Sequence, residues 1–436
     1  MENANNKKGS FKGLLPLVIF LVVYFAMGIG TGDFGNFPLM IGIFLASAIS
    51  LFMNSPVAEK KTFTEKVVMF CKGGGDDTLI LMVIIYMLAG AFYGVASGMH
   101  ATDTVTNIGI SILPANMILP GLFLIGCVLS FSMGTSMGTV AALMPIAINI
   151  ADKTGVGVAL VSGIVVGGAM FGDNLSFISD TTIAAVKTQG CEMKDKFKAN
   201  FFIVLPAAII TVLIFWFVTR NMNFHLEENL SYSLWEVLPY MVVLLGALIG
   251  INVFVVLISG IVISLIVGVS MGHIALSEMF QVVGNGVTSM YDITVISIIV
   301  ACIVSLVKEH GGIQFILNLI KSKINGRRGA EFGIALLALF VDACTANNTV
   351  AIVMTGPIAK EISEEFDVDP RRSASLLDMF TSVGQGIIPY GAQLLSAATL
   401  TGLTPLQIIP NLYYPLLMGV CGVLAIIFRP QSKKLQ

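Results

Sequence analysis

The stretch that decides the fold is Gly172-Asp-Asn-Leu-Ser-Phe-Ile-Ser-Asp-Thr-Thr182, which sets two aspartates and several hydroxyl groups inside a long apolar region. A charged side chain at the centre of a bilayer costs roughly 2.5–3.5 kcal/mol on translocon-insertion scales. Polar, irregular backbone at that depth must be buried in protein or line a water-filled cavity. If the flanking residues span a membrane, this stretch therefore predicts a broken helix at a functional site.

The composition is that of a membrane protein. Of 436 residues, 56% are hydrophobic and 11% are charged, and the mean hydropathy is +0.89, whereas an average soluble domain is about 25% charged. The net charge of −2 gives no basis for nucleic-acid binding. No pair of the six cysteines has CxxC spacing and the four histidines show no ligand spacing, so neither disulfides nor a metal cluster is predicted.

Apolar runs of about 20 residues can cross the hydrocarbon core. The spanning segments expected on this basis are 12–29, 36–53, 78–97, 198–219, 234–250, 251–271, 291–307 and 409–428. The first has no small-residue cleavage site after it, so we interpret it as a helix and not as a signal peptide. Re-entrant hairpins and broken helices are expected where polar and glycine-rich residues interrupt the apolar stretches 106–150, 156–186, 329–366 and 372–403.

Lysine and arginine residues predict the orientation. Cytoplasmic loops carry an excess of both, and such residues gather before the first helix, in 54–77, in 187–198, after 308 and in the C-terminal tail. Segment 98–107 has none. Both termini are therefore expected in the cytoplasm of a multi-pass protein of the cell membrane. The segment 59–72 is expected to form an amphipathic interfacial helix.

An internal repeat emerges when the sequence is shifted by 212 residues. Pro145-Ile-Ala147 then falls on Pro357-Ile-Ala359, and the opening stretch falls on Gly384-Gln-Gly-Ile-Ile-Pro-Tyr-Gly-Ala392. The polar tip Gly134-Thr-Ser-Met-Gly-Thr139 falls on a second tip that contains Ala346-Asn-Asn-Thr349. Chance similarity in a biased composition is the alternative, but three matches in one register favour duplication.

The charges indicate that the two copies are inverted. Segment 187–198 contains four lysines, while its partner 399–410 contains no lysine or arginine. Equivalent segments would thus lie on opposite sides, as in transporters whose site lies at mid-membrane between inverted repeats. The expected regions are 1–75 with the N-terminal helices and the interfacial segment, 76–220 as the first repeat, 221–290 with linking helices, and 291–436 as the second repeat with the C-terminal helix.

The two polar tips are candidates for a cation site. Hard cations take oxygen ligands, and single hydroxyl or amide side chains in membrane helices more often bond to neighbouring helices. Two dense clusters at matching repeat positions favour a site. The side chains concerned are Thr135, Ser136, Thr139, Asn347, Asn348 and Thr349.

Four aspartates lie in apolar surroundings and are candidates for cation binding or proton exchange. Asp173 and Asp180 are seven residues apart, which would place them near one face of a helix. Asp342 and Asp378 belong to the second half, where either could instead cap a helix or pair with a base; Arg371 and Arg372 lie about two turns from Asp378.

The second broken helix, 384–393, has glutamine where the first has aspartate. Gln385, Tyr390 and Gln393 can provide neutral ligands, and the glycines around them permit unwinding. The halves are therefore expected to be unequal.

The chain resembles the NhaC-type sodium/proton antiporter family, part of a broader ion transporter superfamily. The residues that carry the resemblance are Gly134-Thr-Ser-Met-Gly-Thr139, Gly172-Asp-Asn-Leu-Ser-Phe-Ile-Ser-Asp-Thr-Thr182 and Gly384-Gln-Gly-Ile-Ile-Pro-Tyr-Gly-Ala-Gln393. The resemblance implies a scaffold domain that dimerises, a mobile transport domain and elevator-type alternating access. It also implies that first-half site residues include Thr135, Ser136, Asp173, Asn174, Ser176, Ser179, Asp180 and Thr181.

Some positions depart from the family pattern. Phe177 stands where relatives often have proline, and Met137 stands where an aromatic is common. The segment from Leu88 to Asn107 is more similar to a subgroup associated with amino acids or other small organic solutes. The family therefore leaves the substrate open.

Two functions remain after the motif search. The first is Na⁺/H⁺ exchange, in which Na⁺ and protons compete for Asp173 and Asp180, the candidate Na⁺ ligands. The alternative is Na⁺- or H⁺-coupled transport of a small organic solute such as an amino acid. An intramembrane enzyme or a channel is disfavoured, because no hydrolase motif and no selectivity-filter repeat is found. No cofactor is expected beyond Na⁺ as a coupling ion.

Overall fold

A computed structural model describes residues 9–31, 39–54, 57, 59–112, 114–177, 179–220, 233–249 and 251–428 of the chain. All regular structure in these ranges is helical, as predicted. The predicted positions of the termini fall on residues 1–8 and 429–436, which lie outside the described residues.

The helices follow one another along the chain with short connections. The first group comprises η1 (Phe11–Leu14), α1 (Leu15–Thr31), α2 (Leu39–Phe52), α3 (Phe63–Gly74), α4 (Asp77–Gly98) and α5 (Ala101–Ile112). The second comprises η3 (Ala115–Met117), α6 (Ile118–Met133), α7 (Ser136–Thr154), α8 (Val158–Leu175), α9 (Asp180–Gln189) and α10 (Met193–Arg220). The third comprises α11 (Leu234–Leu248), α12 (Val253–Ser270), α13 (Met279–Thr288), α14 (Tyr291–Glu309) and α15 (Gly312–Lys321). The last comprises α16 (Gly326–Thr345), α17 (Asn348–Glu365), α18 (Pro370–Ile387), α19 (Ala392–Thr401), α20 (Pro405–Ile408), η4 (Ile409–Asn411) and α21 (Tyr413–Phe428).

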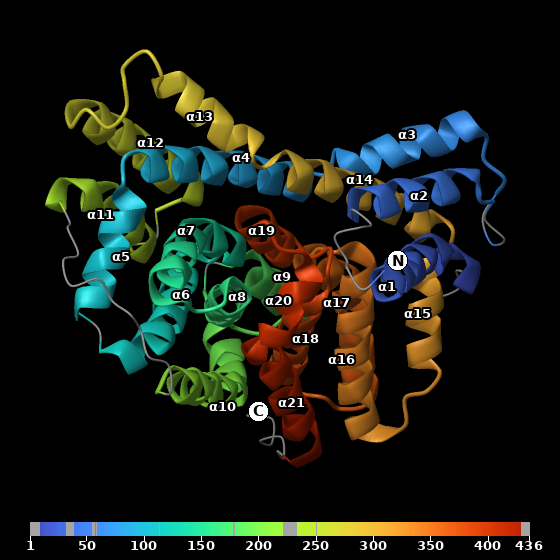
Figure 1. The fold of residues 1–436 in the computed structure, drawn as a ribbon. Helices are drawn as coiled ribbons and strands as arrows, with labels where there is room; N and C mark the ends of the chain where they lie inside the picture. The colour runs from blue at the N-terminus through green and yellow to red at the C-terminus, as the bar shows by residue number, and fades with distance from the viewer. Residues whose placement is uncertain are drawn as a thin grey trace.

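The helices form a long row and a larger body. In Figure 1 the row, made of α12, α13, α4, α14, α3 and α2, runs along one side of the molecule, and neighbouring members pack on one another. The body beneath it contains α6–α10 and α16–α21. Contacts of α4 with α7 and of α14 with α19 join the two parts.

Several helices are suited to cross a membrane. By length and apolar composition alone, four described helices could do so, or up to six if each bent pair counts as one span. The predicted spans 78–97, 198–219 and 251–271 overlap three of the four. The predicted span 409–428 falls within one bent pair, and 291–307 overlaps the other, which begins at Thr294. The segment Val158–Gln189 also qualifies by length and apolar composition, and 78% of its most apolar window is buried inside the protein.

The order of elements repeats at the shift found in the sequence. After subtraction of 212, α18 coincides with α8, and α19 coincides with α9, residue for residue at both ends. The backbone agrees at the connections as well: Thr135 has φ −150 and ψ 118, and Asn347 has φ −151 and ψ 110. Ser176 and Ile388, which follow the two longer helices, have φ −64, ψ 138 and φ −65, ψ 131.

Each polar tip is a tight turn between two antiparallel helices. Gly134 ends α6 in the left-handed region, and the side chain of Thr135 caps α7 by accepting a hydrogen bond from the Gly138 N–H at 3.3 Å. In the second tip Ala346 has φ 50, a conformation unfavourable for a residue with a Cβ, and Asn347 caps α17 through the Val350 N–H at 3.0 Å. The predicted helical hairpins are present at both positions.

The helix α3 overlaps the segment 59–72, which was predicted to be interfacial. The side chain of Thr62 caps α3, and Glu65 completes a capping box. The ammonium group of Lys66 is buried and donates to the carbonyl oxygen of Met53 at 2.7 Å, just after the end of α2. Lys66 therefore ties α3 to α2 instead of facing solvent.

Close glycine contacts hold α4 against α13 in the row. A methyl group added at Gly286 would lie 2.3 Å from the carbonyl oxygen of Gly90, and one added at Gly90 would lie 2.3 Å from that of Gly286. Gly284, on the same helix, has no other group within 4 Å of the corresponding position. Small residues allow this backbone approach, as in other membrane helix pairs.

Gly286→Ala is expected to destabilise the protein, because backbone must move to make room for the methyl group. Overpacking of this kind costs about 1–3 kcal/mol. Gly284→Ala is the matched control and is expected to leave stability unchanged or slightly higher. Thermal denaturation in detergent measures both; equal midpoints for the two variants would contradict the close contact.

Candidate functional site

Both hairpin tips open onto one cavity of about 430 Å³. Its walls come from the row as well as from the body. The lining residues are Leu81, Ile85, Met133, Gly134, Thr135, Ser136, Met137, Asp173, Asp180, Ile251, Asn252, Val253, Asn347, Asn348, Thr349, Gln385 and Gln393. Among these residues the only ionisable groups are two carboxyls, so the cavity has no lysine, arginine or histidine to neutralise them.

Asp173 joins the first tip to the first helix break. Its Oδ2 accepts hydrogen bonds from the Ser136 N–H at 3.1 Å and from the Ser136 hydroxyl at 2.6 Å. Its Oδ1 accepts one from the Ser179 hydroxyl at 2.7 Å. The side chain is buried, and a carboxylate in such a position requires several donors.

Asp180 lies at the first residue of α9 and is exposed to the cavity. Its Oδ2 accepts a hydrogen bond from the Thr349 hydroxyl at 2.9 Å, which links the first helix break to the second tip. Its Oδ1 accepts one from the Thr181 N–H at 3.1 Å. The two halves therefore meet directly at this carboxylate.

Helix N-termini face both carboxylates. Ser136 is the first residue of α7, and Thr349 is the second residue of α17. The N-terminal end of a helix carries a partial positive charge of about half a unit, which stabilises a nearby anion. This geometry holds negative charge in the cavity without a basic side chain.

The second half contributes amide groups. Gln393 Nε2 donates to the Ser136 hydroxyl at 2.8 Å, and Gln385 Nε2 donates to the Ala346 carbonyl at 3.2 Å. Within the described part of the chain, the Oε1 atoms of both glutamines are buried without a hydrogen-bond partner. Two amide oxygens are thus available to a ligand.

The structure gathers only part of the predicted set at this cavity. Thr135, Ser136, Asp173, Asp180, Asn347, Asn348, Thr349, Gln385 and Gln393 line it. Ser179 and Thr181 lie just behind it: Ser179 donates to Asp173, and its hydroxyl is 2.9 Å from that of Thr181. Thr139 is buried and donates to the Thr135 carbonyl at 3.0 Å, while Ser176 is buried at the end of α8.

Asp378 lies away from the cavity, in a buried ion pair with Lys196. Lys196 Nζ also donates to the Asn174 carbonyl at 2.7 Å, at the C-terminal end of α8. Asn174 itself accepts a hydrogen bond from Asn200 at 2.6 Å. Arg371 and Arg372, the expected partners of Asp378, instead pair with Asp369 and Glu331.

Sequence reasoning missed Lys196 and Asn200, because it assigned the lysines of 187–198 to a cytoplasmic loop. A signal was present in the spacing. The positions 196, 200, 203, 204, 207 and 211 form one buried stripe along α10, and these intervals of three and four residues are those of a helix face. Lys196 lies at the N-terminal end of this buried stripe, and the other residues of the stripe are neutral.

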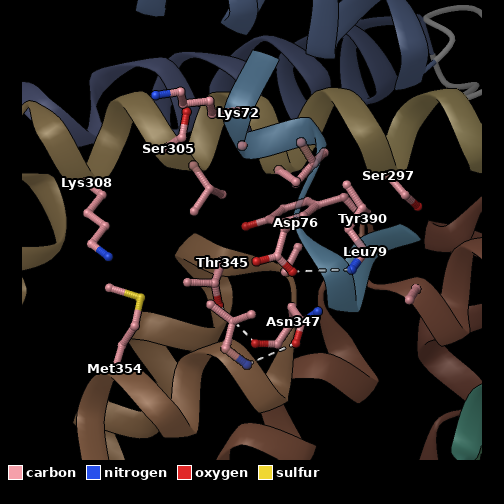
Figure 2. A pocket seen from close by; sticks show the side chains of 17 residues that line it. Lys72, Asp76, Leu79, Ser297, Ser305, Lys308, Thr345, Asn347, Met354 and Tyr390 are labelled. Carbon is pink, nitrogen blue, oxygen red and sulfur yellow. Dashed lines mark hydrogen bonds between the residues drawn. The ribbon is translucent and has the colours of Figure 1, made fainter. Parts of the chain in front are cut away.

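A second cavity, of about 180 Å³, lies on another side of the second tip. Figure 2 shows Lys72, Asp76 and Lys308 around it, together with Thr345, Asn347 and Tyr390. The Tyr390 hydroxyl donates to the Ala343 carbonyl at 2.5 Å. Asn347 lines both cavities, so the turn after α16 lies between them.

Comparison with known proteins decides the family. The model of the family described as "Na+/H+ antiporter family" matches residues 17–220 and 225–429. The chain belongs to the Na⁺/H⁺ antiporter family. It is therefore a multi-pass transport protein of a membrane, as its composition and helices indicate.

Relatives with different names are similar over most of this chain. The malate-2H⁺/Na⁺-lactate antiporter of Bacillus subtilis is 20% identical and covers 95% of this chain and 94% of its own length. The Na⁺/H⁺ antiporter NhaC of the same species is 21% identical, with 89% and 91% covered. The arginine/ornithine antiporter ArcD of Halobacterium salinarum is 20% identical, with 96% and 92% covered.

Among solved structures, the YdaH transporter of Alcanivorax borkumensis aligns with a TM-score of 0.43 and 13% identity. The alignment covers 96% of this chain and 98% of that one.

Lys196→Met is expected to destabilise this antiporter by about 3–5 kcal/mol, because it leaves Asp378 as an uncompensated buried charge. The double variant Lys196→Met/Asp378→Leu is expected to recover most of that loss, since it removes both charges. Lys194→Met, at an exposed position on the same helix, is the control. Thermal denaturation in detergent measures the stability of wild type and of each variant. A double variant as unstable as Lys196→Met would argue against the ion pair between Lys196 and Asp378.

Proposed function

We propose that this family member exchanges Na⁺ for protons at the cavity between the two hairpin tips, with Asp173 and Asp180 as the groups for which they compete. The observation that carries the proposal is the composition of the cavity wall: two carboxyls, many neutral oxygens and no basic side chain. A hard cation takes oxygen ligands of this kind.

The two carboxyls are suited to different parts of the exchange. Asp173 is buried and already bound by Ser136 and Ser179, so it holds the first tip against the helix break. Asp180 is exposed to the cavity and is bound by the hydroxyl of Thr349. In this scheme Na⁺ displaces the proton carried by the carboxyls, and the Thr349 contact closes the second tip over the ion.

Alternating access is proposed to follow from an inverted repeat. The two hairpins have matching backbone angles at their turns, and the lysine distribution differs between equivalent segments 187–198 and 399–410. The repeats are assigned to 76–220 and 291–436, with 1–75 and 221–290 as N-terminal and linking regions. We further propose cytoplasmic termini, and an elevator motion of the body against the row in a homodimer, as the family resemblance implies.

Transport of a small organic solute is a second candidate. The cavity, at about 430 Å³, is in the range of small-molecule sites, which run from about 300 to 1,000 Å³. The buried Oε1 atoms of Gln385 and Gln393 could accept hydrogen bonds from such a solute. The names of two relatives, a malate/lactate antiporter and an arginine/ornithine antiporter, are compatible with this function.

Asp180→Asn is expected to abolish Na⁺-dependent proton flux in proteoliposomes. An amide cannot carry the proton that Na⁺ displaces, and the loss of a charged ligand worth about 1.5–3 kcal/mol would also weaken the ion's affinity by roughly tenfold or more. Asp152→Asn, which removes an exposed carboxyl on α7 outside the cavity, is the matched control and should behave as wild type. Internal pH is followed after addition of Na⁺. Wild-type flux in the Asp180 variant would remove this carboxyl from the mechanism.

The same vesicles separate the two candidate functions. Labelled lactate, malate and arginine are added under a Na⁺ gradient. Proton flux without any solute supports exchange of the two ions alone, whereas solute uptake without solute-free proton flux supports coupled solute transport.

Inversion of the repeats predicts opposite accessibility at equivalent positions. Asp152 on α7 and Glu364 on α17 are related by the 212-residue shift, and both are exposed. Single cysteines at these positions, in a variant lacking the native cysteines, are expected to react with an impermeant maleimide from opposite sides of oriented vesicles. Labelling of both from one side would contradict inversion.

A further inference from the structure

Asp342 is a buried carboxyl that the exchange at Asp173 and Asp180 does not use. Its side chain is completely shielded from solvent, and neither Oδ1 nor Oδ2 has a hydrogen-bond partner among the described residues. No ion pair in the described ranges includes it. An isolated carboxylate in an apolar interior is strongly disfavoured, and a neutral carboxylic acid is the form such a site tolerates.

We propose that Asp342 is a proton-binding site of its own, separate from the cation cavity, which gains and loses one proton in each transport cycle. The chemistry is a single protonation of the carboxylate to the carboxylic acid and its reversal, with no other reactant. That this proton belongs to the transport cycle rests on the proposed exchange function. That Asp342 binds a proton does not.

The surroundings of Asp342 suit a proton better than a metal cation. Three nearby backbone carbonyls already accept hydrogen bonds: that of Asp342 from the Ala346 N–H at 2.7 Å, that of Ala343 from the Tyr390 hydroxyl, and that of Ala346 from Gln385. On the facing helix, a methyl group added at Gly384 would lie 2.6 Å from Asp342 Oδ2. This leaves little room for a coordination shell.

The second cavity offers a route for the proton. Thr345 and Ala346, which follow Asp342 by three and four residues, line it, as does Tyr390 (Figure 2). The titratable groups on which the charge of Asp342 acts are Cys344, on its own helix, and Tyr390, on the segment between α18 and α19. Lys72, Asp76 and Lys308 are the charged groups of the cavity wall.

The first half has no carboxyl at the position equivalent to Asp342. The residue equivalent to Asp342 at the 212-residue shift is Ser130, whose hydroxyl donates to the Ala169 carbonyl at 2.5 Å. That position is thus a satisfied neutral group, whereas Asp342 is an unsatisfied acid. The difference assigns the two halves different tasks: the first holds the carboxylates of the cation cavity, and the second adds the separate proton.

Infrared spectroscopy tests the proton directly and needs no transport. Purified protein labelled with ¹³C-aspartate is titrated with pH in detergent. A protonated, isotope-shifted aspartic acid band is expected in wild type and in Asp173→Asn/Asp180→Asn, which lacks the two carboxyls of the cation cavity. In that double-variant background, its loss is expected when Asp342→Asn or Asp342→Ser, which installs the first half's residue, is added. Asp152→Asn is the control and should keep the band. Persistence of the band in both Asp342 variants, or its absence from wild type throughout the titration, would overturn the proposal.

Transport then tests the role of the proton. In Asp342→Asn, ²²Na⁺/Na⁺ exchange should continue, while Na⁺ uptake driven by a pH gradient should fall by roughly tenfold or more. Loss of both in a folded variant, or retention of both, would contradict a separate proton site. If wild type exchanges no Na⁺ at all, the proposed function fails, and the infrared result still decides whether Asp342 binds a proton.

Discussion

The hydrogen bonds that bind Asp173 are the constraint on which the rest of the body depends. A buried carboxylate is tolerated only when donors surround it, and here the donors come from two separate places, Ser136 at the first residue of α7 and Ser179 at the helix break. The hairpin α6–α7 must therefore end where α8 ends. The tight turn at Gly134 and the close glycine contacts between α6 and α8 make that approach possible.

The second half reuses the same backbone with different side chains. Glutamine at 385 and 393 replaces Asp173 and Thr181, so the cavity gains amides in place of charge. Thr349 then reaches back to Asp180, and Gln393 reaches Ser136, so two hydrogen bonds join the halves at the cavity. Because the charge is concentrated in one half, a cation bound between the tips would lie closer to the first, and the hydroxyl and amide groups of the second would complete its surroundings.

The fold class and both tips could be predicted from the sequence because their signals are local. Apolar length identifies helices such as α10 and α12, and the polar interruptions at 134–139 and 172–182 identify the turn and the break. Asp173, Asp180 and residues of both tips line one cavity. Asp378 does not, because it pairs with Lys196, 182 residues away; the helical spacing along α10 marks Lys196 as buried but does not say which carboxyl it meets. The left-handed conformation of Ala346 was not predicted either, since a residue with a Cβ rarely adopts it.

The central claim is that Na⁺ and protons compete for the carboxyls of one cavity. Equilibrium ²²Na⁺ binding to purified protein at a series of pH values tests it most directly, because binding needs neither vesicles nor a gradient. If each Na⁺ displaces one proton, affinity should fall about tenfold per pH unit on the acidic side, and Asp173→Asn/Asp180→Asn should bind no Na⁺. Affinity that does not change with pH, or unaltered binding in the double variant, would contradict the account.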